Sequence, residues 1–150
     1  MQKTTGCVRA VAGLGLLLGM AGAAFAANPP ATGLGQSWPN ATDVSRDTHY
    51  HAYAFVLNGI KYVQINDANG NVLGAIGTSN GQFITLPVGR YAQHVHTPQQ
   101  PASVSAATPI TAPVVVYQDD TTQITAAAQS DGTMMIQAAF DPIEASSRIQ

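Results

Sequence analysis

Apolar and polar residues alternate from His49 to Arg90, and three Asn-Gly dipeptides interrupt the alternation at even intervals: Asn58-Gly59, Asn69-Gly70 and Asn80-Gly81. Alternation with a period of two is typical of β-strands, because successive side chains point to opposite faces of a sheet. Asn-Gly favours the two-residue type I′ turn, in which both residues need a positive φ. The pattern therefore predicts a four-strand antiparallel meander.

The turns also predict the register of this meander. If each Asn-Gly is a two-residue loop, Phe55 pairs with Tyr62, Val63 with Ile76, and Gly77 with Ile84. Each face then collects large apolar residues: Tyr53, Phe55, Leu57, Tyr62, Ile84 and Leu86 on one, and Val56, Val63, Ile65, Val72, Ile76 and Phe83 on the other. A free-standing sheet does not expose two such faces to water, so the segment 114–140 is expected to cover the second face.

The second half of the chain predicts about three further strands. Residues 97–113 are rich in Pro, Ser, Thr and Ala and predict a surface crossover. Val114 to Tyr117 and Met134 to Phe140 read as strands, with Asp131-Gly132 as a hairpin turn. The segment 119–130 favours a strand, although its alanines leave a helix open. The sequence thus predicts an all-β fold, either a small β-sandwich or a barrel.

Residues 1–26 have the features of a cleaved signal peptide, with Lys3 and Arg9 ahead of an apolar run that ends in Ala24-Phe25-Ala26. We expect a periplasmic or extracellular mature chain without a membrane span. Cys7 leaves with the signal, so no thiol remains. Residues 27–46 predict an extended leader, in which we expect Trp38 to pin the segment to the core, with a sugar-stacking platform as the alternative role of this residue. Residues 47–140 predict a single β domain and 141–150 a tail.

Charge excludes one large class of partner. Charged residues make up 9% of the chain, and Asp and Glu number 8 against 6 Lys and Arg, which are scattered. A scattered, slightly acidic charge distribution does not fit nucleic-acid binding. No nucleophile motif or phosphate-binding glycine loop is present, so the sequence names no catalytic residue. These features favour a non-catalytic binding or interaction domain for a protein or small-molecule ligand, or for a second copy of itself.

The four histidines form two His-x-His pairs, His49 with His51 and His94 with His96. Residues two apart on a strand share a face, at a separation that two imidazoles can span to bind one metal ion. Asp47 adds a carboxylate two residues before His49. These five residues predict a possible site for Zn, Cu or Fe. The alternative is that the histidines are polar strand-end residues that stack on neighbouring tyrosines.

Two short segments resemble the motifs of cupins, which are small β-barrels that often bind a metal. His49-x-His51 is followed by Val56-Leu57-Asn58-Gly59, and Gly81 precedes Pro87-Val88-Gly89 by five residues. The chain departs from that pattern at two ligand positions, because Phe55 or Val56 stands in place of a glutamate and Ala92 in place of a histidine. The resemblance implies a third function, a cupin-like metal-dependent enzyme, beside the binding domain and a periplasmic metal-binding protein.

Overall fold

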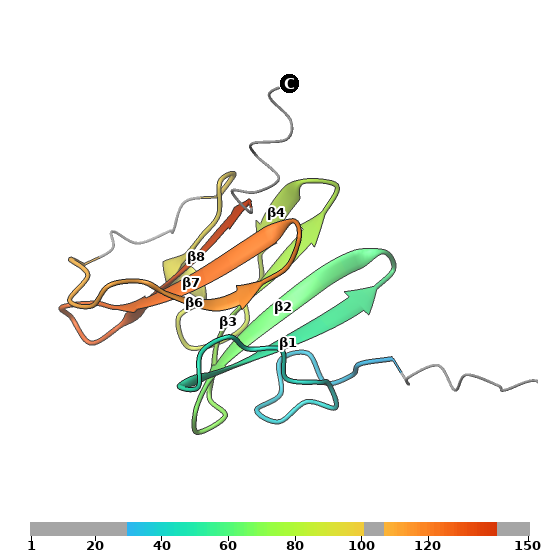
Figure 1. Ribbon diagram of the computed structural model, residues 1–150, viewed down its shortest axis with the longest axis horizontal. Coiled ribbons are helices and arrows are strands. Elements are labelled where there is room, and N and C mark those ends of the chain that lie inside the picture. The colour runs from blue at the N-terminus through green and yellow to red at the C-terminus, as the bar shows by residue number, and fades with distance from the viewer. Residues whose placement is uncertain (1–29, 101–106, 141–150) are drawn as a thin grey trace, which may run out of the picture.

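The computed structural model describes residues 30–100 and 107–140, which form two four-stranded sheets packed face to face (Figure 1). The first sheet has the order β1-β2-β3-β4 and consists of β1 (Tyr50–Leu57), β2 (Ile60–Asp67), β3 (Val72–Ser79) and β4 (Gln82–Thr85). The second has the order β5-β8-β7-β6 and consists of β5 (Val95–His96), β6 (Val114–Gln118), β7 (Thr122–Ala128) and β8 (Met134–Phe140), with the short 3-10 helix η1 (Ala92–His94) ahead of β5. The predicted all-β class is confirmed, with the sandwich as its form.

Two of the three Asn-Gly turns have the predicted geometry. Asn58 and Asn80 have φ values of 51° and 50°, and the glycine after each also has a positive φ. Both dipeptides therefore make two-residue loops of the type I′ kind. The register that follows from them is confirmed, since Phe55 pairs with Tyr62 and Gly77 with Ile84. The pairing of Val63 with Ile76, predicted from the middle turn, is also found.

The middle turn is more open than predicted. β2 ends at Asp67 and β3 begins at Val72, and the pairing shifts at Ile65/Asn66. The Asp67 carboxylate accepts hydrogen bonds from the backbone amides of Asn69 and Asn71, both at 2.9 Å. A carboxylate that gathers nearby amides stabilises a longer loop, which explains why this Asn-Gly does not form the tight turn.

The hydrophobic core lies between the sheets and uses the second of the two predicted faces. Its buried members from the first sheet include Val63, Ile65, Ile76 and Phe83, and those from the second include Val116, Ile124, Ala126, Ile136 and Ala138. The prediction that residues 114–140 cover this face is confirmed. The segment 119–130 contains β7, so the helix alternative is wrong and the strand is right.

The leader covers the opposite face of the first sheet, on the side away from β6–β8 (Figure 1). Two fully buried amides of β2 hold it there. Gln64 accepts a hydrogen bond from the Gly35 amide at 2.6 Å and donates one to the Gln36 carbonyl at 2.8 Å, while Asn66 donates to the Ser37 carbonyl at 2.6 Å. The side-chain amides of Gln64 and Asn66 thus form hydrogen bonds with the backbone of residues 35–37, so that the buried polar groups of both β2 and the leader have partners.

Residues 43–46 of the leader, named the strap below, connect the two sheets along one side of the sandwich. The Val44 amide donates to the Ala52 carbonyl of β1 at 2.8 Å, and the Arg46 amide donates to the Val116 carbonyl of β6 at 3.0 Å. The Asp43 carboxylate accepts a hydrogen bond from the Ala52 amide at 3.1 Å. The strap therefore occupies backbone groups at the outer edges of both sheets.

A salt bridge joins the sheets near the β1–β2 turn. Lys61 projects from β2 to Asp119, which precedes the β6–β7 turn and also accepts a hydrogen bond from the Tyr117 hydroxyl at 2.6 Å. Burial favours the protonated acid, but Lys61, Tyr117 and the Thr121 amide outweigh it and hold the pKa of Asp119 well below its usual range. Asp119 thus stays ionised and links the sheets at neutral pH.

β5 has no recognisable signal in the sequence: it is a two-residue strand that runs parallel to β8 through the pair Val95 and Ile136. The predicted signal peptide (1–26) and tail (141–150) lie outside the described residues. Among residues 30–100 and 107–140, no helix is long and apolar enough to cross a membrane.

Candidate functional site

Two carboxylate–histidine pairs lie at the start of β1. His51 Nδ1 is 2.6 Å from Asp43 Oδ2, and His49 Nδ1 is 3.0 Å from Asp47 Oδ1. The expected grouping of Asp47 with both His49 and His51 differs from this arrangement, because Asp47 turns back onto the His49 backbone amide at 2.8 Å. The carboxylate beside His51 comes instead from the strap.

Both carboxylates favour their ionised form. Partial burial raises the pKa of Asp43, but the hydrogen bond from His51 and those from the Ser45 and Ala52 amides outweigh it and lower the pKa. For Asp47, the His49 amide is the largest cause of a lowered pKa. An ionised Asp43 accepts a hydrogen bond from His51 Nδ1–H, and in that tautomer His51 Nε2 is a hydrogen-bond acceptor.

His94 and His96 lie on other elements, at the end of η1 and in β5. His94 Nδ1 and His96 Nε2 are buried and have no hydrogen-bond partner among the described residues. Within residues 30–100 and 107–140, no group of three or more His, Cys, Asp or Glu is arranged to hold a metal ion. Metal binding by the five residues named from the sequence stays a prediction.

Trp38 lies beside the Asp43–His51 pair and is 60% exposed. A Cβ atom at Gly70 would fall 2.6 Å from its indole ring, so one side of the ring rests directly on the β2–β3 turn. The His51 ring meets the indole at 67° with 5.4 Å between centroids and stacks on Tyr53 at 6.1 Å. Trp38 was expected to pin the leader to the core, and it instead lies on the surface while Gln64 and Asn66 hold the leader.

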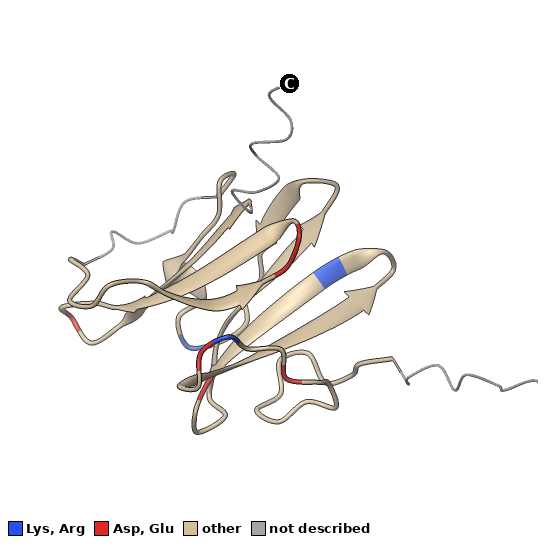
Figure 2. Ribbon diagram, in the orientation of Figure 1, with Lys and Arg blue, Asp and Glu red and all other residues tan. Residues whose placement is uncertain are grey.

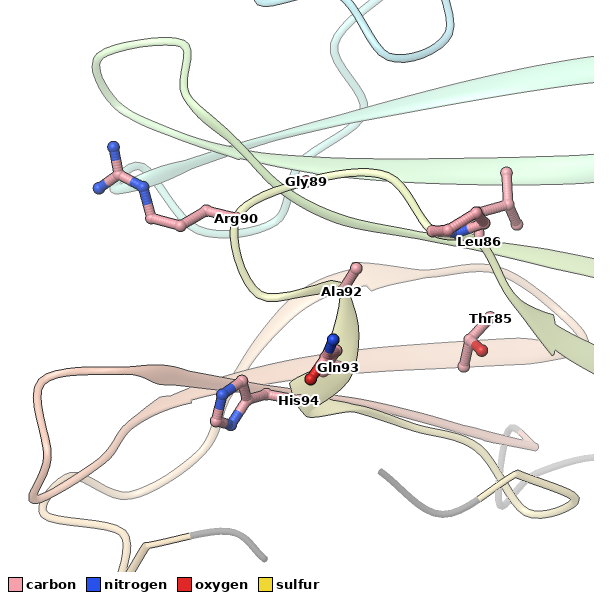
Figure 3. A pocket seen from close by; sticks show the side chains of 8 residues that line it. Thr85, Leu86, Gly89, Arg90, Ala92, Gln93 and His94 are labelled. Carbon is pink, nitrogen blue, oxygen red and sulfur yellow. The ribbon is translucent and has the colours of Figure 1, made fainter. Parts of the chain in front are cut away.

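A surface cavity of about 450 Å³ follows β4 (Figure 3). Its lining residues are Thr85, Leu86, Pro87, Gly89, Arg90, Ala92, Gln93 and His94. In Figure 3 the Arg90 side chain points away from Ala92 and Gln93, so the polar groups do not converge on one point. A cavity of this kind offers no set of groups that could act together on one substrate atom.

The two outer strands of the first sheet differ in how their backbone is protected. On β4, the amides of Phe83 and Thr85 donate to the side-chain oxygens of Gln99 and Gln100 at 3.2 and 2.7 Å. On β1, the leader pairs antiparallel through the bridge between Asp43 and Tyr53, which covers Ala52 and places Thr42 beside Ala54. Beyond this pairing, the outward amide and carbonyl of Val56 have no partner among the residues that the structure describes. We name Val56–Leu57 the open edge.

Sequence reasoning missed Asp43 and the two glutamines. The Asp43 carboxylate accepts a hydrogen bond from the backbone amide of Ser45, two residues later, at 2.9 Å. An aspartate that bonds to the amide two residues on is a recognisable turn signal. Nothing in the sequence could indicate that Asp43 also meets His51 or that Gln99 and Gln100 lie along β4. Comparison of the chain with protein-family models, with curated proteins and with solved structures found no match, so its function has to be inferred from its own residues.

Proposed function

We propose that this protein is an exported, non-catalytic interaction module that pairs with an extended strand along its open edge. Export rests on the signal peptide predicted for residues 1–26. The observation that carries the interaction is the contrast between the open edge of β1 and the glutamine-covered edge of β4. Unpaired backbone groups at a sheet edge are a template for another strand.

The direction of the backbone groups supports this function. Leu57 and Ile60 flank a two-residue loop, so the odd-numbered residues of β1 bond to β2 and the even-numbered residues point away. The Val44 amide indeed reaches Ala52 from outside the sheet. Val56 therefore presents its amide and carbonyl outward, beyond the point where the leader pairs with β1.

The side chains at the open edge are suited to contact with another chain. Val56 is 68% exposed and Leu57 is 43% exposed. β1 contains no Lys, Arg, Asp or Glu, and the nearest cation, Lys61, is neutralised by Asp119 (Figure 2). Natural sheets often protect an edge with a charge, and this edge has none.

The first occupant to consider is a second copy of this chain. Two copies of the open edge paired antiparallel about Val56 would place Val56 of each opposite Val56 of the other, which obeys two-fold symmetry and can form about two backbone hydrogen bonds. So short an overlap buries far less than the ~1,200 Å² of a stable interface, so the dimer should be weak, with Kd in the range of about 0.1–1 mM.

Sedimentation velocity of the mature chain over a concentration series tests this function. We expect the sedimentation coefficient to rise between about 10 μM and 1 mM in the wild type. Val56→Lys should remain monomeric, because a charge on each copy would face the same apolar edge. Gln82→Lys adds the same charge to β4, where the edge is already covered, and should associate like the wild type.

A wild type that stays monomeric at about 1 mM would contradict self-pairing. Association that Val56→Lys and Gln82→Lys reduce equally would show that net charge, and not the open edge, governs it.

A second candidate function, metal binding, is supported by the unpartnered nitrogens of His94 and His96. Neutral imidazole nitrogens of this kind are common ligands for Zn²⁺ and Cu²⁺. Calorimetric titration of the metal-free chain should then give a defined stoichiometry, and a His94→Ala/His96→Ala variant should lose it while His49→Ala/His51→Ala keeps it. Equal binding by the wild type and the His94→Ala/His96→Ala variant would contradict this site.

A further inference from the structure

Trp38 is an exposed indole that the open edge does not include, and the partly exposed side chains of His51 and Asp43 lie next to it, with the buried Tyr53 stacked on His51. We name Trp38, His51 and Asp43 the Trp38 platform. Trp38 is exposed although it is the one tryptophan of the chain and sits in a firmly held segment. The carbonyls of Gln36 and Ser37, just before it, accept hydrogen bonds from buried side chains of β2. The ring is thus presented to solvent by a fixed backbone.

Neighbouring residues also hold the indole in one orientation. Gly70 lies against one side of the ring, where no Cβ atom would fit. The His51 ring packs edge-on against it, and Asp43 in turn fixes His51 at 2.6 Å. A platform that is ordered before it binds loses little conformational entropy on binding.

Hydrogen-bonding groups stand beside the open part of the indole. With Nδ1–H directed to Asp43, His51 Nε2 can accept a hydrogen bond, and it has no protein partner among the described residues. The Asp43 side chain is partly exposed, and the exposed side chains of Gln36 and Asn40 flank Trp38 along the leader. Residues 30–45 contain no Lys or Arg, so the platform has no group that would select an anion.

This combination matches the chemistry of a sugar ring. A pyranose has a flat face of C–H groups, which packs on an indole, and a rim of hydroxyls, which donate to carboxylate, imidazole and amide acceptors. The platform lies outside the cavity of Figure 3 and is open, which suits one unit of a longer chain better than an enclosed small molecule.

We propose that the Trp38 platform binds a neutral oligosaccharide, with one pyranose ring stacked on Trp38 and its hydroxyls hydrogen-bonded to Asp43 and His51. The Trp38 platform and the open edge consist of different residues, so a result that overturns one proposal leaves the other unaffected. It adds a small-molecule specificity to a protein that pairs with strands elsewhere on its surface.

The single tryptophan makes binding directly measurable, because all indole emission of the chain comes from the platform. Neutral tetrasaccharides of glucose and of N-acetylglucosamine are the probes, and choline and a tetramer of galacturonic acid are the charged comparisons. At least one neutral tetrasaccharide should shift the Trp38 emission in a saturable way, and neither charged probe should do so. Calorimetry on the same samples should give the same affinity.

Variants separate stacking from general surface effects. Trp38→Ala should weaken binding by about tenfold or more in calorimetry, Trp38→Phe should retain part of it, and His51→Ala should weaken it by a smaller factor. Ile110→Ala, which removes a side chain of similar exposure on another part of the surface, should bind like the wild type.

Two outcomes of the binding experiments and one of the variant experiments would overturn this proposal. One is the absence of any saturable response to all neutral tetrasaccharides at about 10 mM, a concentration above the Kd of even weak single-ring sites. The other is a response to choline alone, which would make the indole and Asp43 a site for organic cations. Binding that survives Trp38→Ala unchanged would likewise place the sugar elsewhere.

Discussion

β1 and β4 are the two outer strands of the same sheet, and their backbones meet different surroundings. Along β4, Gln99 and Gln100 cover the amides of Phe83 and Thr85 with side-chain oxygens. Along β1, the leader pairs as far as Tyr53, which lies opposite Asp43, and the outward backbone of Val56 is uncovered. The contrast teaches that this chain covers one edge with glutamine side chains and the other with leader backbone and the single carboxylate of Asp43, and that it places no lysine or arginine along either strand.

The largest expected effect comes from opening the rest of β1. Asp43→Ala removes the acceptor for the Ala52 amide, which is buried, together with the partner of His51. We expect the free energy of unfolding to fall by about 2 kcal/mol, because a buried amide loses its hydrogen bond. Urea denaturation measures the loss, and self-association should become stronger as the strap loosens.

Asp47→Ala is the matched control for Asp43→Ala. Its carboxylate binds only His49, an exposed residue outside the sheet, so the free energy of unfolding should change by less than about 0.5 kcal/mol. Equal losses in the two variants would show that Asp43 does not hold the strap.

The next effect comes from uncovering β4. A Gln99→Ala/Gln100→Ala variant exposes the amides of Phe83 and Thr85 to water, and we expect a loss of about 1 kcal/mol in the free energy of unfolding. It should also create a new self-association, visible by sedimentation, that Val56→Lys does not suppress. Gln93→Ala, which changes an exposed glutamine of η1, should leave both properties unchanged.

Acid should weaken the two inter-sheet connections in the same direction. The folded-state pKa of Asp43 and that of Asp119 both lie below the usual carboxyl value. Their contribution to stability is therefore fully present above the unfolded pKa of about 3.9 and is lost as pH falls through the folded values. For each variant, the urea midpoint is measured at about pH 7 and about pH 3. The difference between the two midpoints should be smaller in Asp119→Asn than in Asp43→Asn, since the pKa of Asp119 is shifted further.

The smallest expected effect on stability tests the direction of the β1 backbone. Val56→Pro removes an amide that points away from β2, so the strand ladder keeps its hydrogen bonds and the free energy of unfolding should fall by less than about 1 kcal/mol. Self-association should disappear because the open edge loses a donor. A loss of about 3 kcal/mol or more would instead mean that this amide bonds within the sheet.

The first sheet could be predicted in detail because its determinants are local. Asn58-Gly59 and Asn80-Gly81 set their turns, and a strand period of two then decides which face each neighbour occupies. The middle turn escaped prediction because Asp67 collects amides from both sides of Asn69-Gly70, and a side-chain bond of this kind competes with the tight turn.

The candidate sites could be predicted only in part, because they depend on residues far apart in the sequence. His51 was identified from its spacing to His49, but its partner Asp43 comes from the leader, which has no periodic pattern. The open edge is recognised only when the covered parts of the sheet edges are known. Gln99 and Gln100 cover β4 and the strap covers part of β1, and all of these contacts join residues that are separated in the sequence. The exposure of Trp38 follows from Gln64 and Asn66 holding the leader in its place.

The strap also has a consequence for the order of folding. Chains emerge from the N-terminus first, so residues 43–46 are available before either strand that they join. Arg46 cannot reach its partner Val116 until the whole first sheet and the crossover have been made, and contacts of such high sequence separation form slowly. The contacts of Asp43 and Val44 with Ala52 are local and can form as soon as β1 exists. The strap therefore docks in two steps, first on β1 and much later on β6.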